Sequence, residues 1–439
     1  MESKTPSSKR ALGPWMLTAL VAGNMVGSGI YYLPTELAGF GSISILSWLF
    51  TCGGAILLAL VFAKLGMIMP RIGGPYAYCH EAFGEFVGFQ MAYNYWLAIW
   101  IGNSAIAVAF AGYVGVFIPA LNVHPLYSYF VSIGGLWFLT LVNCMGIRAA
   151  GTTQLVTTIL KFAPLLLITV VGVFYLHPNL IPPFNTSGKT NLAAFSGAAT
   201  LTLWAFVGLE SATVPAENVE NPKRTIPRAT IIGTLIASLV YILGSVAVMG
   251  QIPADQLAHS TAPFADAARI LFGPVGASLI AIGAIISCFG ALNGWTLLQA
   301  QIPLAASRDG IFPKIFSKQS RAGTPVNGLI ITSILITCLL FLTLDKGLIK
   351  QFQFITLLAT LSSLIPYFFT TMAELMIFMK DRDLLKHTNL IPSVIIAILA
   401  GIYAFWTIIG SGQDTVFYGT LLFFSSIPVY IWIKYREVP

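Results

Sequence analysis

Long segments without a charged side chain constrain this sequence more than any other feature. No Asp, Glu, Lys or Arg occurs in residues 11–35, 37–63, 86–147, 229–254, 270–307, 322–344, 351–373, 387–413 and 415–433. A helix needs roughly 20 apolar residues to cross the hydrocarbon core of a membrane. Charged residues make up 9% of the chain, whereas a soluble domain carries about 25%. The sequence therefore predicts an all-α polytopic membrane protein.

The same segments give an estimate of the number of helices. Segment 86–147 is 62 residues long, so it must hold two spans, with a turn between Pro119 and Pro125. Two more helices fit around 152–176 and 193–216, each with one internal charge. Division into spans of roughly 20 residues gives about twelve helices. We expect one membrane domain over residues 1–439.

The positive charges predict the orientation of these helices. If the N-terminus is cytoplasmic, 18 of the 23 lysines and arginines lie in cytoplasmic turns or at the termini. The other five are Lys161, Lys189, Arg269, Lys346 and Lys350. This is the distribution expected from the positive-inside rule. It predicts a multi-pass protein of the inner (plasma) membrane with both termini in the cytoplasm. The net charge of +7 then reflects topology, and no nucleic-acid partner is expected.

Several function classes lack their motifs here. The five cysteines have no paired spacing, and the five histidines fall near predicted helix ends or in loops without a metal-binding pattern. No phosphate-binding glycine loop or nucleophile motif occurs. We expect no metal site, no cofactor, no enzymatic activity and no ATP-driven transport.

Two predicted helices contain residues that break a span. The first, in "GNMVGSG", contains Asn24, Gly27, Ser28 and Gly29; the second, in "FVGLESATVP", contains Gly208, Glu210, Ser211 and Pro215. Counted in order these are helices 1 and 6. Interrupted segments at corresponding positions of two halves indicate a transporter built from inverted repeats. We therefore predict five helices plus five, over residues 11–176 and 190–380, with two peripheral helices in 387–435.

An interrupted helix can bind a ligand. Unpaired backbone groups at membrane depth are tolerated only where they line a cavity, and the N-terminus of the following half-helix attracts a carboxylate. Glycines let the ligand touch the backbone. The alternative is close helix packing, which Gly23-x-x-x-Gly27 also fits. Packing does not require the neighbouring Asn and Ser or a second break, so we favour a carboxylate site.

Seven segments together resemble a known family. "GNMVGSGIYYLP", "IGGPYAY", "YWLAIWIGN", "LWAFVGLES", "NPKRTIPRAT", "GWTLL" and "DGIFP" are similar to segments of the amino acid–polyamine–organocation transporters, especially the basic amino acid/polyamine antiporters such as the arginine/agmatine antiporters. The resemblance runs from about Leu12 to Tyr435. It implies a LeuT-type fold of twelve helices without sodium coupling, and a homodimer, which members of this family often form.

The resemblance also implies roles for individual residues. Asn24, Ser28 and Gly29 match the helix-1 break that holds the substrate carboxylate, and Val207 lies beside the helix-6 break. The remaining substrate contacts that the resemblance implies are Trp204, Trp295, Ala98, Asn103 and Ala359. Tyr95, Glu210 and Tyr367 match a distal gate, in which Glu210 is the candidate proton-responsive acid.

Physical arguments support some of these roles. The faces of Trp204 and Trp295 could hold a cation by about 0.5–2 kcal/mol each, although membrane tryptophans commonly serve packing. Glu210 is the only acid between Thr190 and Pro215, and a carboxylate at that depth must pair or titrate. Its alternative role is a structural hydrogen bond to a tyrosine.

Three residues depart from the arginine/agmatine pattern. Lys161 lies inside the predicted fifth helix. The resemblance implies that its ammonium group occupies the position of sodium in sodium-coupled relatives. There it either carries a coupling proton or is a fixed cation; the alternative is a lysine that snorkels to the membrane surface. Ala359 stands where the arginine-specific members of the family have a serine, and Ile106 stands where they have a methionine. These two leave the substrate open among arginine, ornithine, lysine, a polyamine and a neutral amino acid.

The expected function is secondary transport by alternating access. The favoured hypothesis is exchange of a basic amino acid for its decarboxylated amine or another cation, with the lipid bilayer and a small molecule as partners. Proton-coupled uptake of neutral amino acids is the alternative. A non-transporting sensor would need a soluble output domain, and a channel would need rings of charge along its pore; neither feature is present in the sequence.

Overall fold

The computed structural model describes residues 12–320, 323–380 and 390–435. Within these ranges the chain is helical, and the one β-type pairing is an isolated bridge between Leu12 and Val219. The α-helices are α1 (Pro14–Met25), α2 (Ser28–Ala38), α3 (Ile43–Ile68), α4 (Pro75–Phe83), α5 (Glu85–Val114), α6 (Ala120–Val123), α7 (Pro125–Cys144), α8 (Ile147–Phe174), α9 (Asn191–Trp204), α10 (Pro222–Met249), α11 (Ala254–Leu257), α12 (Pro263–Arg308), α13 (Val326–Leu342), α14 (Leu348–Lys380), α16 (Leu390–Gly410) and α17 (Gln413–Tyr435). The 3₁₀ turns are η1 (Pro178–Leu180), η2 (Ala216–Asn218), η3 (Lys314–Ser317) and η4 (Leu344–Lys346).

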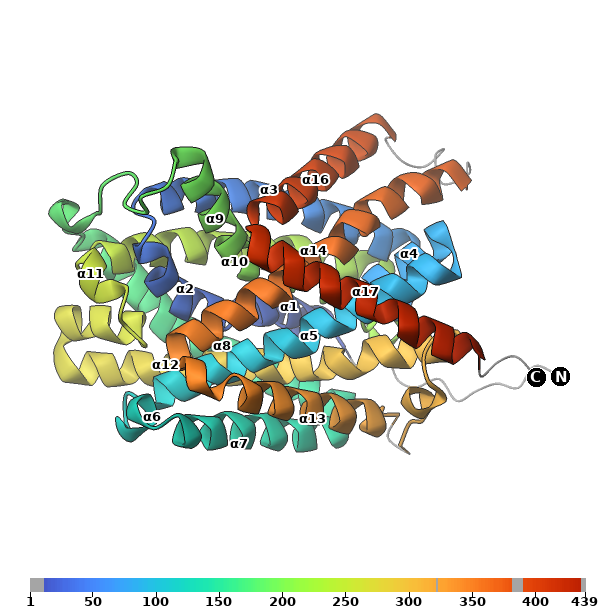
Figure 1. Ribbon diagram of the computed structural model, residues 1–439, viewed down its shortest axis with the longest axis horizontal. Coiled ribbons are helices and arrows are strands. Elements are labelled where there is room, and N and C mark those ends of the chain that lie inside the picture. Colours follow the sequence, from blue (N-terminus) through green and yellow to red (C-terminus); the bar gives the residue numbers. More distant parts are fainter. Residues whose placement is uncertain (1–11, 321–322, 381–389, 436–439) are drawn as a thin grey trace.

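Most long helices run along the long axis of the molecule (Figure 1). Ten of the described helical segments, with α1 and α2 taken together, are long and apolar enough to cross a membrane. Two other apolar helices are shorter, since α13 has 17 residues and α9 has 14. The polytopic, all-helical class is therefore confirmed, whereas the count of twelve and the repeat boundaries stay predictions. Residues 11 and 321–322 of the predicted repeats and residues 387–389 of the predicted peripheral helices lie outside the described residues.

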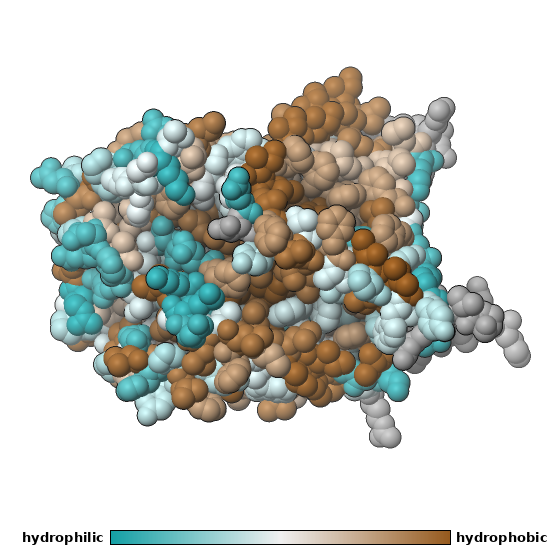
Figure 2. Space-filling model, viewed as in Figure 1, coloured by the Kyte–Doolittle hydropathy of each residue, from teal (hydrophilic) through white to brown (hydrophobic). Residues whose placement is uncertain are grey.

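The surface matches a lipid environment along the sides of this bundle. Large hydrophobic side chains are exposed on the outer helices, for example Phe405 and Ile409 on α16 and Phe424 on α17. Hydrophobic side chains cover much of the middle of the molecule, and hydrophilic ones gather toward the two ends of the long axis (Figure 2). In water such exposure would be unfavourable, but in a bilayer it is the ordinary state of a lipid-facing surface.

Regular helical geometry stops between α1 and α2. Val26 and Gly27 have non-helical backbone angles, and the Gly27 N–H bonds to the carbonyl of Met25 in place of the carbonyl of Gly23. Side chains donate hydrogen bonds to the carbonyl oxygens that lack a helical partner at this interruption. Lys161 Nζ lies 2.7 Å from Gly23 O and 2.5 Å from Val26 O, and Ser287 Oγ lies 3.0 Å from Val26 O.

A second irregular segment follows α9. The helix ends at Trp204, and residues 205–215 form successive turns. Gly208 has a φ of +116°, which only glycine adopts readily. Buried hydrogen bonds support this segment from other helices and from within, because the Tyr241 hydroxyl donates to Ala205 O and the Thr213 hydroxyl donates to Glu210 O. These two irregular segments face one another at the centre of the bundle.

Candidate substrate site

A small cavity lies between the two irregular segments. Its volume is about 10 Å³, and its wall is formed by Asn24, Met25, Ser28, Gly29, Ile106, Trp204, Val207 and Trp295. These residues come from α1, α2, α5, the turns after α9, and α12. Trp204 is 8% exposed and Trp295 is 5% exposed, so both tryptophans of the wall are buried.

Six of the eleven predicted substrate-binding residues line this cavity: Asn24, Ser28, Gly29, Trp204, Val207 and Trp295. The other five, Gly27, Ala98, Asn103, Gly208 and Ala359, are not among the lining residues. Met25 was not predicted, because the methionine before the break gives no signal of its own in the sequence. Ile106 was noted only as a departure from the family pattern.

The backbone at the start of α2 forms one side of the cavity. Ser28 and Gly29 are the first two residues of that helix, and no side chain caps its N-terminus. The first N–H groups of a helix have no intrahelical partner and carry partial positive charge. Gly29 also packs closely, because a Cβ there would lie 3.1 Å from Ala205 Cα. The arrangement can bind an anionic group such as a carboxylate.

Asn24 joins three elements around the cavity. Its amide nitrogen donates to Ser211 Oγ at 2.9 Å, and its backbone carbonyl accepts from Trp295 Nε1 at 3.2 Å. Its side-chain oxygen is buried and has no hydrogen-bond partner. A buried amide oxygen without a partner is costly. This oxygen packs against Gly294 on α12, where an added Cβ would lie 1.9 Å from it.

The five residues outside the lining have other neighbours. A Cβ on Gly102 would be 3.0 Å from the Trp204 ring and 3.7 Å from Ala359 Cβ, so both residues pack against this part of α5. Gly27 faces Ala291, and Gly208 lies between Asn24 and Trp295. Ala98 is buried on α5, one turn before Gly102. Asn103 is fully buried and donates to Gln299 Oε1 at 2.7 Å.

Gly208→Ala is expected to abolish substrate binding. The new Cβ would lie 3.0 Å from the Trp295 ring and 3.2 Å from Asn24 Cβ, in a backbone conformation that alanine rarely adopts. Strain of about 1–3 kcal/mol would push both side chains into the cavity. Binding of labelled substrate to purified protein measures the effect. Gly53→Ala is the matched control, because nothing lies within 4 Å of its added methyl group; equal binding by both variants would contradict the prediction.

The three predicted gate residues meet. Glu210 accepts hydrogen bonds from the hydroxyl of Tyr95 on α5, the hydroxyl of Tyr367 on α14, and the Gly208 N–H at 3.1 Å. All three side chains are 0% exposed. The carboxylate therefore ties the turns after α9 to two long helices, directly beside the cavity wall at Val207.

Lys161 lies on the other side of α1. It is 0% exposed, so it does not snorkel to the membrane surface. Its ammonium group fills the gap in the α1 backbone that Gly23 and Val26 leave. The cation thus has a structural partner set made of carbonyl oxygens, and it faces away from the cavity lining.

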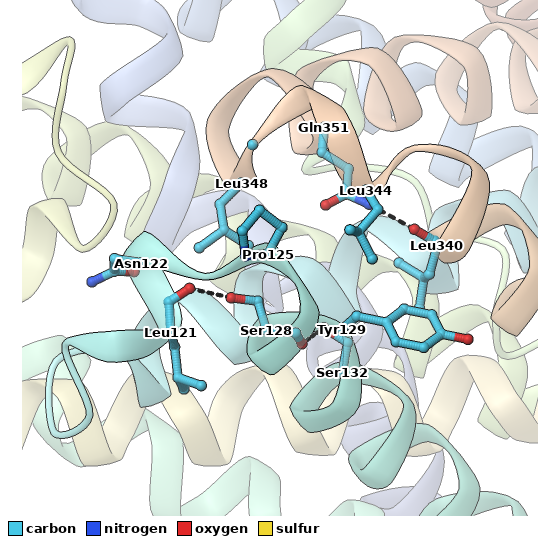
Figure 3. A pocket seen from close by; sticks show the side chains of 11 residues that line it. Leu121, Asn122, Pro125, Ser128, Tyr129, Ser132, Leu340, Leu344, Leu348 and Gln351 are labelled. Carbon is cyan, nitrogen blue, oxygen red and sulfur yellow. Dashed lines mark hydrogen bonds between the residues drawn. The ribbon is translucent and has the colours of Figure 1, made fainter.

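A different pocket lies near the ends of α6 and α7, opposite η4 and the start of α14 (Figure 3). Its polar groups are occupied by local hydrogen bonds, such as Ser132 to Ser128 O and Gln351 to Leu340 O. None of the predicted site residues lines it. The cavity between the irregular segments is therefore the better candidate site.

The fold defines a class: a polytopic helical membrane protein, here with a small cavity between two irregular segments of its helices. The chain belongs to the amino acid permease family, whose model matches residues 12–433. The predicted membership in the amino acid–polyamine–organocation superfamily is thereby confirmed.

Named relatives cover the chain almost completely. The putrescine transporter PotE of Escherichia coli K12 is 35% identical over 429 residues, 98% of this chain and 97% of its own length. A putative arginine/ornithine antiporter of Bacillus subtilis is 35% identical, covering 96% of this chain and 97% of its own. The cadaverine/lysine antiporter of E. coli K12 is 36% identical, covering 83% of each chain. These are transport proteins, as expected for a chain without enzymatic motifs.

Proposed function

We propose that this protein is a secondary antiporter that exchanges a basic amino acid for a decarboxylated amine or another organic cation. The observation that carries the proposal is the cavity itself, whose wall contains both the uncapped N-terminus of α2 and two indole rings. An amino acid has a carboxylate for the first and, if basic, a cation for the second. The names of the relatives, which combine amino acids and amines, favour this over uptake of neutral amino acids.

Residue roles follow from this proposal. The start of α2 and Asn24 bind the α-carboxylate and α-ammonium groups, Trp204 and Trp295 hold the side chain, and Glu210 with Tyr95 and Tyr367 forms the gate. Lys161 is a fixed cation that supports the broken α1 helix. The two inverted repeats, the homodimer, the inner-membrane location and the cytoplasmic termini stay predictions; Lys4, Lys9, Arg10 and Arg436 lie outside the described residues.

An exchange assay in liposomes tests the function. Purified protein is reconstituted with unlabelled arginine, agmatine, ornithine, putrescine, lysine or alanine inside, and uptake of labelled arginine is measured. We expect uptake only when a basic amino acid or amine is trapped inside. Uptake into empty vesicles driven by a proton gradient would overturn obligatory exchange, and equal support by internal alanine would overturn the preference for cations.

Glu210→Gln is expected to flatten the pH dependence of exchange. The substitution removes the titratable group of the gate but keeps a side chain of the same size between Tyr95 and Tyr367. Initial exchange rates from pH 5 to pH 8 measure the effect. Glu374→Gln is the matched control, since Glu374 is also buried on the membrane-spanning part of α14 but does not contact the cavity. If Glu210→Gln keeps the pH profile of the unaltered protein, Glu210 is not the titrating group, and Lys161 is the next residue to test.

A further inference from the structure

A chain of buried side-chain hydrogen bonds runs from α7 to α5. Thr140 on α7 contacts Ser333 on α13 at 2.8 Å, Gln299 Nε2 on α12 donates to Ser333 Oγ at 3.3 Å, and Asn103 Nδ2 on α5 donates to Gln299 Oε1 at 2.7 Å. Each of these four side chains is at most 1% exposed. Ser333 and Gln299, which link Thr140 to Asn103, were not predicted to have a function.

The donors and acceptors along this series of hydrogen bonds can be assigned in only one direction. Thr140 has one hydroxyl hydrogen, and it donates that hydrogen to Leu136 O at 2.9 Å. The hydroxyl of Ser333 must therefore donate to Thr140, which leaves the Ser333 oxygen to accept from the Gln299 amide. The oxygen of Gln299 then accepts from the Asn103 amide nitrogen. The Asn103 oxygen is left at the end of the chain, buried and without a partner.

This end of the chain lies one helical turn from the cavity. Helices α5 and α12 run antiparallel, as the contacts of Phe89 with Phe312 and of Asn103 with Gln299 show. Ile106 and Trp295 line the cavity from these two helices. Asn103 is three residues before Ile106, and Gln299 is four residues after Trp295, so both lie on the same side of the cavity. The preceding residue on α5, Gly102, faces the Trp204 ring.

We propose that Gln299 and Ser333 are positioning residues for substrate specificity. They hold the Asn103 amide with its oxygen free, so that Asn103 offers the far end of the substrate an acceptor and withholds its N–H donors. A guanidinium or primary ammonium group has only donors and satisfies that oxygen; a group that presents its own oxygen does not. The inference rests on the proposed exchange of basic amino acids, because it assigns the far end of that same site.

Arginine and citrulline provide the test, because citrulline replaces part of the guanidinium by a carbonyl oxygen. Both compete against labelled arginine for binding to purified protein, and the ratio of their affinities is measured. In Gln299→Met the amide of Asn103 is free to rotate, so we expect the arginine-to-citrulline ratio to fall about tenfold, as for one mismatched buried hydrogen bond. Ser333→Ala frees the Gln299 amide and is expected to lower the ratio in the same direction, by less.

Two further variants separate positioning from general damage. Thr337→Val removes a hydroxyl one turn further along α13, where it contacts Trp137 and Ser333 O but not the chain to Asn103; its ratio is expected to equal that of the unaltered protein. Adding Asn103→Asp to Gln299→Met is expected to restore the preference for arginine, since a carboxylate has acceptors in either orientation. If Gln299→Met is not monodisperse, Ser333→Ala and Thr337→Val decide the question.

The outcomes distinguish this inference from the proposed function. If the unaltered protein binds citrulline as well as arginine, the proposed preference for cations is wrong. If it prefers arginine, and both Gln299→Met and Ser333→Ala keep the full ratio, the preference stands but the positioning chain is wrong. A loss of ratio in Thr337→Val equal to that in Ser333→Ala would also overturn the positioning role.

Discussion

Lys161→Met is expected to lower both the thermal stability of the protein and its rate of exchange. The ammonium group of Lys161 donates to Gly23 O and Val26 O, and Ser287 also donates to Val26 O. Methionine would leave Gly23 O without that donor inside the bundle. An unpaired buried backbone group costs about 1–3 kcal/mol, and the strain falls on the segment that carries Asn24 and Ser28. We expect exchange to fall about 10- to 100-fold, as measured by initial rates in liposomes.

Thr158→Val is the matched control for this change. Thr158 lies on the same helix one turn before Lys161 and donates to Ala19 O at 3.3 Å, within the regular part of α1. Loss of that bond should change the midpoint of thermal unfolding and the exchange rate only slightly. A Lys161→Met protein with unaltered stability and exchange would show that the broken helix does not depend on this cation. Loss of pH dependence without loss of stability would instead identify Lys161 as a proton carrier.

Trp295→Leu is expected to lower the binding affinity for cationic substrates far more than the affinity for neutral ones. The substitution removes the ring face from the cavity wall and also the N–H that bonds to Asn24 O at 3.2 Å. Loss of a cation–π contact costs about 0.5–2 kcal/mol, so the ratio of arginine to norleucine affinity should fall about 2- to 30-fold. The loss of the hydrogen bond should weaken both ligands together. Competition binding to purified protein measures both effects.

Trp295→Phe separates the two contributions. Phenylalanine keeps an aromatic face but has no N–H, so the ratio should stay near its original value while both affinities fall. Trp137→Leu controls for the loss of a tryptophan elsewhere, because Trp137 bonds to Thr337 and does not line the cavity. Equal losses for arginine and norleucine in Trp295→Leu would remove the cation–π role from this residue.

The two glycines at which the sequence predicts interruptions have a local explanation. Gly27 and Gly208 lie within segments long and apolar enough to be continuous helices, and the structure has non-helical backbone at both positions. The reason is local at these positions, because glycine adopts non-helical backbone angles at little cost. Proline gave no such signal, since Pro164 and Pro366 lie inside continuous helices. The meeting of Glu210 with Tyr95 and Tyr367 followed from the family resemblance. Sequence spacing alone could not have joined residues that lie 115 and 157 positions apart.

Other parts of the site had no local signal. Gln299 and Ser333 are ordinary polar residues in apolar helices, and only the packing of α12 against α5 and α13 gives them partners. The position of Lys161 was open between snorkelling and burial, because both are compatible with a lysine ten residues into a helix. Burial against the α1 break depends on how α8 packs against α1.

The sequence by itself determined that this chain is a membrane-embedded helical bundle, since the lack of charge over whole segments excludes any other solvent. It also pointed to Gly27 and Gly208 as positions of irregular backbone, because glycine adopts conformations that other residues avoid. Only the tertiary structure decided which of those residues surround one cavity, and which way the Asn103 amide points. Both depend on contacts between helices far apart in the chain, and hydrogen-bond direction is a property of the whole buried chain of donors and acceptors.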